Sequence, residues 1–461
     1  MAKIFNKSLA LINTFFKGHD RSVKAKKNIV ASFAIKGLSI IVGFLMIRIT
    51  LQYLDKTTYG IWLTLTSFLG WFAFFEIGLG SGLKNKLAEA LANKDFVLAK
   101  IYISTTYAIL SIVIGTVGFL FLIGNFFIDW NFILNTDEIL ASELTSLTFI
   151  IFSFFFLSFV LSLIKTVLAA DQRPAIAYAL GPIGNLIMLI IIYVLTKTTE
   201  GSLIYLGWVL STVPVIIITI ATIYFYQNDY KKIAPSIKFV KFKYAKDLLN
   251  LGFKFFLIQI SALVMFQSSN FIITQFYGPA EVTPFQIAYK LFSVITMVFT
   301  IIVAPFWVAY TDAWVTKDID WIKRSTKNLL YVWLGLLLMG IFLFFISDIF
   351  FEFWLSKKEM EGIVITTRLK VALLVYFLLF TFGGIFNMFI NGVGKLSIQM
   401  YSLLIGSLIF IPVAIFFIKY LHWGIESVVI ASIIANFYSP FIAPVQYKKL
   451  INNRAYGIWN K

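Results

Sequence analysis

The chain is divided into about twelve apolar stretches, each long enough to cross a lipid bilayer and separated by short polar loops. The composition agrees, because 60% of the residues are hydrophobic and only 13% are charged. A helix in hydrocarbon satisfies its own backbone hydrogen bonds and excludes polar side chains, so the pattern predicts an all-α integral membrane protein. We place the spans at 29–51, 60–80, 101–124, 144–168, 176–196, 203–226, 250–276, 285–310, 328–347, 366–390, 398–418 and 425–444.

The segments between the spans are too short to hold a separate catalytic domain, which usually needs about 100–150 residues. The chain has no cysteine, and its two histidines, His19 and His422, lie far apart in the sequence and outside the spans. No metal site is therefore predicted. No phosphate-binding glycine loop with its lysine is present, which argues against direct use of ATP. We expect neither an enzyme nor a cofactor.

Basic residues decide the orientation in the membrane. The formal net charge is +17, and lysine and arginine concentrate in the segment before the first span and in the loop between spans six and seven. By the positive-inside rule both termini and this loop are cytoplasmic. Since these charges flank spans and form no separate basic module, we expect the lipid bilayer and no nucleic acid as their partner. The predicted parts are a segment 1–28, an N-lobe 29–226, a linker 227–249, a C-lobe 250–444 and a tail 445–461.

Segment 1–28 has no secretory signal, because it lacks a continuous apolar core. Phe5, Leu9, Ile12 and Phe16 instead share one helical face. This pattern indicates an amphipathic helix on the inner membrane surface, and a solvated basic tail is the alternative.

The two groups of six spans resemble each other. The segment 183–187 in span five matches 405–409 in span eleven at a spacing of 222 positions, and Arg173 falls on Lys395 at the same spacing. With six spans in each repeat, both repeats enter the membrane from the same side. Parallel repeats of this kind predict two six-helix lobes around a central cavity, where a substrate would bind.

Prolines interrupt three of the spans and remove a backbone hydrogen-bond donor from each. They are Pro214 in span six, Pro305 in span eight and Pro412 in span eleven. Either they produce ordinary packing kinks or they allow the helices to bend during gating.

Ionisable side chains inside the spans are the main candidates for function, because each costs at least about 2.5 kcal/mol to insert and normally faces the protein interior. Four are cations: Lys36 and Arg48 in span one, Lys254 in span seven and Lys290 in span eight. Arg48, Lys254 and Lys290 lie close enough to a span end that they could instead extend to the membrane surface. Glu76 in span two could pair with a cation or bind a coupling proton or sodium ion.

The excess of cations favours an anionic substrate. Moving a pyrophosphate through hydrocarbon carries a large desolvation penalty unless positive charges replace its hydration shell. Lysine and arginine between two lobes would supply these charges. A cavity for a cationic drug should instead have carboxylates in excess.

The chain resembles the polysaccharide flippases of the multidrug/oligosaccharidyl-lipid/polysaccharide exporter superfamily over nearly its whole length. In the first half the resemblance rests on Tyr59-Gly60, on Glu76-Ile77-Gly78-Leu79-Gly80 and on the amphipathic segment from Leu83 to Lys94. In the second half it rests on Ala304-Pro305-Phe306-Trp307 and on Asn391-Gly392-Val393-Gly394-Lys395.

This resemblance implies alternating access in a bacterial inner membrane, with an undecaprenyl-pyrophosphate-linked oligosaccharide as substrate and a polysaccharide polymerase and a chain-length regulator as partners. Lys36 and Lys254 would then bind the pyrophosphate, with Arg48 and Lys290 nearby, and Glu76 would couple ions. Two alternatives remain: a multidrug or metabolite exporter of the same superfamily, and a membrane polymerase or ligase of lipid-linked glycans. The acidic residues of the long loops, such as Glu359 and Glu361, have no partner histidine and are interpreted as solvated loop charges.

Overall fold

The computed structural model describes residues 20–72, 79–136, 141–171, 173–245, 253–303 and 306–460. Within these residues the chain forms helices and short turns and contains no β-strand. Nine described helices are long and apolar enough to cross a membrane, and a tenth span is a pair of helices bent by 42° at residues 435–438. The two other predicted spans correspond to α2 (Asp20–Tyr53) and α3 (Lys56–Phe72). The prediction of an all-helical, multi-pass membrane protein is confirmed.

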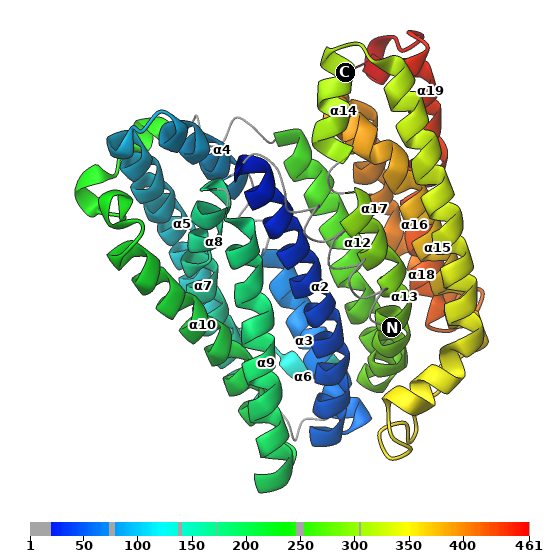
Figure 1. The fold of residues 1–461 in the computed structure, drawn as a ribbon. Coiled ribbons are helices and arrows are strands. Elements are labelled where there is room, and N and C mark those ends of the chain that lie inside the picture. The colour runs from blue at the N-terminus through cyan, green and yellow to red at the C-terminus, as the bar shows by residue number, and fades with distance from the viewer. Residues whose placement is uncertain are drawn as a thin grey trace, which may run out of the picture.

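Two lobes lie side by side, as the blue-to-green and green-to-red halves of Figure 1 show. Besides α2 and α3, the N-lobe contains α4 (Leu79–Ala92), α5 (Phe96–Gly124), α6 (Trp130–Leu134), α7 (Ala141–Leu161), α8 (Leu163–Ala170), α9 (Pro174–Thr198) and α10 (Leu203–Gln227). In this lobe α2 packs on α9, α7 packs on α10, and α4 packs on both α5 and α8.

The helices of the C-lobe are α12 (Phe253–Tyr277), α13 (Val282–Val303), α14 (Phe306–Val315), α15 (Ile319–Trp354), α16 (Thr367–Val393), α17 (Ser397–Lys419), α18 (Glu426–Ala435) and α19 (Ala443–Ile451). Helix α12 packs on α17, and α16 packs on α13, α14 and α15. The π-helical turn η8 (Tyr438–Ile442) separates the halves of the last span and packs on α16, where Gly383 leaves space for the backbone of Ser439.

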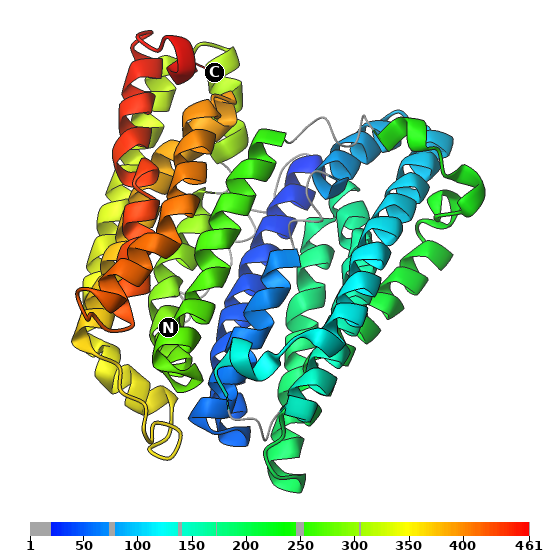
Figure 2. The same ribbon diagram turned by 180° about the vertical axis from the view of Figure 1, so that it is seen from behind.

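The bundle has two distinct ends (Figures 1 and 2). The described part of the linker, residues 228–245, and the C-terminal residues lie at one end, here called the linker end. The opposite end, here called the far end, holds Lys56 and the loop 355–366.

The helix bounds differ from the predicted spans mainly at this linker end. The last span continues through α19 to Ile451, past the predicted boundary at 444, and its final turn carries Lys448 and Lys449. Long basic side chains can reach the membrane surface from a helix end, so the hydropathy signal stops before the helix does. The predicted amphipathic segment from Leu83 to Lys94 corresponds to α4. Of the predicted segment 1–28, residues 1–19 lie outside the described residues and 20–28 begin α2.

A local arrangement at the linker end repeats in the two lobes. In the N-lobe Arg173, at the start of α9, forms ion pairs with Asp171 and with Asp229 of the linker. Tyr230 follows in the linker and donates a hydrogen bond to Asp171, and burial and this bond raise its pKa. In the C-lobe Lys395, before α17, donates a 2.9 Å hydrogen bond to the carbonyl oxygen of Asn460 in the tail. In each lobe a basic side chain at the matched position thus holds the segment that follows the sixth span.

Candidate functional site

The two lobes are joined at the far end by polar contacts of Lys56. Its Nζ atom lies 2.9 Å from Glu281 Oε1 and donates a second 2.9 Å hydrogen bond to the carbonyl oxygen of Gly362. The backbone oxygen of Lys56 accepts a 2.7 Å hydrogen bond from Thr283 Oγ1. A Cβ atom placed on Gly60 would lie 1.8 Å from the carbonyl oxygen of Pro279. Glycine at position 60 therefore permits direct contact of α3 with the turn before α13.

Cross-lobe contacts continue along α3 toward the middle of the bundle. The hydroxyl oxygens of Thr64 and Thr274 lie 2.6 Å apart, and both residues are fully buried. Asn270 Nδ2 donates a 3.3 Å hydrogen bond to the carbonyl oxygen of Leu63. The amide of Gln267 lies against Gly70, where an added Cβ atom would come within 2.1 Å of Nε2. Helix α12 thus contributes three polar side chains to the contact with α3.

Helix α2 makes the second contact with the C-lobe, centred on Phe44. Trp354 Nε1 donates a 2.9 Å hydrogen bond to the carbonyl oxygen of Phe44, and the two rings pack with their centroids 4.7 Å apart. The predicted cation Lys290 reaches the same place. Its Nζ atom lies 5.9 Å from the Phe44 ring centroid and 2.8 Å from a Cβ atom built on Gly43.

Lys290 is half-buried in this contact, and no carboxylate of the described residues forms an ion pair with it. Its described neighbour is an aromatic face, which attracts a cation more weakly than a carboxylate does. Lys290 therefore places its amine between the lobes without a carboxylate partner among the described residues.

Arg48, one turn after Phe44 in α2, is in a different situation. Its Nε atom lies 3.6 Å from Glu359 Oε2, and this carboxylate also accepts a 2.6 Å hydrogen bond from the backbone of Ser356. Glu359 is only 7% exposed, so its interpretation as a solvated loop charge was wrong. The error arose because hydropathy cannot reveal that the loop 355–366 folds over the end of α2. A role of Arg48 in substrate binding stays a prediction, and here its charge is shared with Glu359.

The structure leaves the other predicted site residues untested. Lys36 lies in α2 and Lys254 in α12, but their side chains are outside the described part of the structure. Glu76 and Pro305 also lie outside the described residues. Pro214 and Pro412 lie inside α10 and α17, which continue through them as single helices. Their role in gating stays a prediction. No group of three or more possible metal ligands occurs within the ranges that the structure describes.

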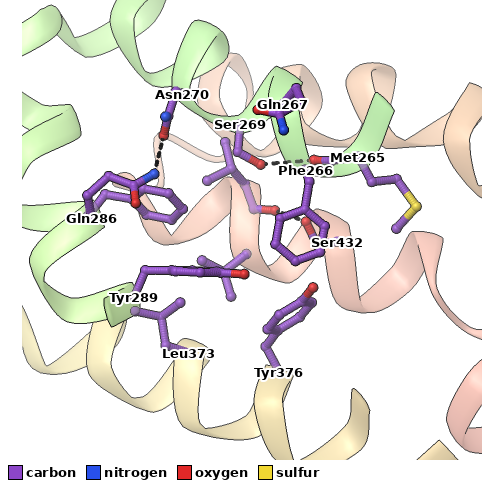
Figure 3. A pocket seen from close by; sticks show the side chains of 13 residues that line it. Met265, Phe266, Gln267, Ser269, Asn270, Gln286, Tyr289, Leu373, Tyr376 and Ser432 are labelled. Atoms are coloured by element: carbon purple, nitrogen blue, oxygen red, sulfur yellow. Dashed lines mark hydrogen bonds between the residues drawn. The ribbon is translucent and has the colours of Figure 1, made fainter. Parts of the chain in front are cut away.

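A cavity of about 180 Å³ lies inside the C-lobe, between α12, α13, α16 and α18 (Figure 3). Its polar lining comes from amides, phenols and hydroxyls, including Asn270, Gln286, Tyr289 and Tyr376. Sequence reasoning missed these residues because it searched for charges. One sign of these residues is present in the sequence: Gln286 and Tyr289 are three positions apart, which places both on one face of α13.

No protein-family model matches the chain, and no curated protein matches it in sequence. Solved structures do match over almost its full length. A multidrug resistance MATE family transporter of the MOP superfamily, in an inward-facing conformation, has a TM-score of 0.73 at 15% identity, with 92% of this chain and 98% of that chain covered. The chain has the MATE transporter fold. This fold agrees with the two helical lobes of the structure.

Two further solved structures also match nearly the whole chain. An outward-facing multidrug resistance MATE family transporter has a TM-score of 0.61 at 16% identity, with 93% of this chain and 96% of that chain covered. A MOP superfamily transporter from Pyrococcus furiosus has a TM-score of 0.63 at 16% identity, with 94% and 97% covered, and a reversed polarity of its binding pocket suggests a different function for it.

Proposed function

We propose that the protein is a membrane transporter that works by alternating access between its two lobes. The observation that carries this proposal is the position of the cross-lobe contacts described above, which all lie between the far end and the middle of the bundle. Such contacts keep the lobes together at the far end and have to break before a route can open there. The higher TM-score to an inward-facing MATE transporter than to an outward-facing one supports this interpretation.

For the substrate we favour amphipathic organic molecules, exported as by a multidrug transporter. The structure named above with the highest TM-score, 0.73, is a multidrug resistance transporter, and this supports an exporter better than the lipid-linked oligosaccharide flippase that the sequence suggests. Lys290 limits the charge of the substrates that we expect. A cation between the lobes without an ion-pair partner among the described residues repels cationic molecules and favours anionic or uncharged ones.

The flippase is the second candidate, and Lys290 is also the observation that favours it. A pyrophosphate group entering the lobe contact would replace the aromatic neighbour of Lys290 with a strong ion pair. The bacterial inner membrane, the polymerase and chain-length regulator as partners, and the binding roles of Lys36, Lys254 and Arg48 belong to this proposal. So does coupling to a proton or a sodium ion through Glu76.

The test is transport in liposomes with imposed proton or sodium gradients. Three fluorescent probes are compared: a cationic dye, an anionic dye of similar size and a polyprenyl-pyrophosphate-linked oligosaccharide. We expect transport of the anionic dye by the wild type, a loss of at least roughly tenfold in Lys290→Gln and retention in Lys290→Arg, because a charge-assisted interaction contributes about 1.5–3 kcal/mol.

Each other outcome has a defined meaning. Movement of the lipid-linked oligosaccharide alone, with the same dependence on Lys290, selects the flippase. Transport of the cationic dye that is unaffected by Lys290→Gln contradicts the charge preference. Transport of no probe under either gradient, by protein whose folding is verified by its thermal transition, contradicts the proposed substrate classes.

A further inference from the structure

The cavity inside the C-lobe is separate from the contact between the lobes that contains Lys290. Its polar lining consists of Gln267 and Asn270 from α12, Gln286 and Tyr289 from α13, Tyr376 from α16 and Ser432 from α18. Figure 3 shows these side chains around one space, with the two phenol groups pointing inward from the lower side and the amides arranged above them. Four helices therefore direct hydrogen-bonding groups into the same volume.

None of the side chains that line this cavity is charged. Gln286 Nε2 donates a 2.7 Å hydrogen bond to Asn270 Oδ1, which leaves the carbonyl oxygen of Gln286 available. Within the described part of the chain, the hydroxyls of Tyr289 and Tyr376 have no hydrogen-bond partner in the protein. Both hydroxyl oxygens are accessible, so each can donate or accept a hydrogen bond with a molecule that enters the cavity.

Size and lining together define the class of molecule that fits. A volume of 180 Å³ is close to the roughly 150 Å³ of an engineered protein cavity that binds benzene, so it holds one six-membered ring. The ring of Phe266 stands perpendicular to that of Tyr289, with centroids 5.9 Å apart, and gives the cavity apolar walls. A charged ligand would lose its hydration without gaining an ion pair, whereas a ring with hydroxyl groups matches both the amides and the aromatic walls.

We propose that the C-lobe cavity binds an uncharged, hydroxyl-bearing ring, such as a single sugar residue, and that its occupancy weakens the contact between the lobes. The weakening of the lobe contact rests on the proposed alternating-access function and is inferred from the positions of Asn270 and Gln267. Each lines the cavity, and each also touches α3: Asn270 through its hydrogen bond to Leu63, and Gln267 through its packing on Gly70. The Asn270 nitrogen has two N–H groups, and a ligand that draws the amide into the cavity lengthens its hydrogen bond to Leu63, which at 3.3 Å is already long.

Binding is tested first, on the full chain in nanodiscs free of glycoside detergents. Saturation-transfer NMR compares two uncharged probes, D-glucose and N-acetyl-D-glucosamine, with the cation glucosamine and the anion glucuronate. We expect saturable binding of at least one uncharged probe and none of the charged ones. Gln286→Leu should abolish this binding, and Tyr376→Phe should weaken it roughly three- to tenfold, because it removes one hydrogen bond and keeps the ring. Tyr401→Phe, which changes an exposed tyrosine of α17, is the matched control.

Three results would overturn the site: equal binding of charged and uncharged probes, binding that Gln286→Leu leaves unchanged, or no binding of any probe, which would mean that the cavity holds only water. Thermal transitions of the variants verify that they fold. Because binding requires no transport, a failure of the transport assay leaves this result intact.

The coupling is tested by the distance between spin labels on cysteines introduced at Lys197 and Lys358, in a chain that has no cysteine of its own. Both residues are exposed and line a surface hollow between the lobes at the far end. We expect a saturating uncharged probe to increase the population with the longer distance, and Asn270→Leu to increase it without the probe. An unchanged distance distribution in protein that binds the probe would overturn the coupling.

Discussion

Lys56, the first residue of α3, forms a 2.9 Å ion pair with Glu281, directly before the first residue of α13, and so joins the two lobes at the far end of the bundle. The side chain of Lys56 is 19% exposed and that of Glu281 is 37% exposed. The ammonium group also bonds to the carbonyl oxygen of Gly362, so it ties three segments of the chain together. A transporter that opens at this end has to break these contacts.

The first prediction concerns this ion pair. Because the pair is partly exposed, its contribution is about 0.5–1 kcal/mol, and its removal should shift the population of open and closed forms roughly two- to fivefold. Lys56→Gln should therefore increase the open population, measured with spin labels at positions 197 and 358. The charge reversal Lys56→Glu should increase it further, and Lys56→Glu combined with Glu281→Lys should restore it in part. Identical distance distributions in all four proteins would contradict a role of the pair in closing the far end.

The second prediction uses two glycines with different surroundings. Alanine is normally favoured over glycine within a helix by about 0.5–1 kcal/mol. At Gly60 of α3 the added methyl group would lie 1.8 Å from the carbonyl oxygen of Pro279, whereas at Gly115 of α5 no atom lies within 4 Å. We expect Gly60→Ala to lower the transition temperature or to separate the lobes at the far end, and Gly115→Ala to leave both unchanged or to raise stability. Thermal unfolding and the same spin-label distances measure both effects, and equal behaviour of the two variants would contradict the close approach.

The third prediction concerns Arg48 and Glu359. Glu359 is buried, and besides its contact with Arg48 it accepts one backbone hydrogen bond, from Ser356. Arg48→Met would leave a buried carboxylate without its cation, which should destabilise the protein by about 1–3 kcal/mol. Arg48→Met combined with Glu359→Gln should recover much of this loss, because the neutral amide costs less to bury. Thermal unfolding of the four proteins gives the coupling between the two residues. Additive effects of the two substitutions would mean that the 3.6 Å contact contributes nothing.

The sequence predicts the helical architecture well because hydropathy acts over about 20 residues at a time and does not depend on partners. It correctly indicates a multi-pass helical protein and the amphipathic helix α4. Contacts between helices need information that a single sequence does not hold. Nothing in the sequence indicates that Lys56 pairs with Glu281, which lies 225 positions away.

The candidate site was predicted only in part, for a related reason. Intramembrane charge is visible in a sequence, so Lys290 was identified, and the structure places it between the lobes. The polar residues of the C-lobe cavity carry no charge, and a glutamine or tyrosine in a span is not unusual enough to be selected. Only the convergence of α12, α13, α16 and α18 brings Asn270, Gln286 and Tyr376 together.

The last prediction tests alternating access with a covalent bond between the lobes. The hydroxyl oxygens of Thr64 in α3 and Thr274 in α12 lie 2.6 Å apart, so sulfur atoms at the same positions would be close to the 2.05 Å length of a disulfide bond. The chain has no cysteine, so Thr64→Cys combined with Thr274→Cys introduces the only possible pair. We expect oxidation to form this bond and to slow transport in liposomes at least roughly tenfold, because lobes joined by a disulfide cannot separate at the far end. Reduction should restore transport, and each single variant should be insensitive to oxidant. If the oxidised double variant transports as fast as the same variant after reduction, α3 and α12 do not separate during transport. The contact at Thr64 is then only a fixed part of the fold.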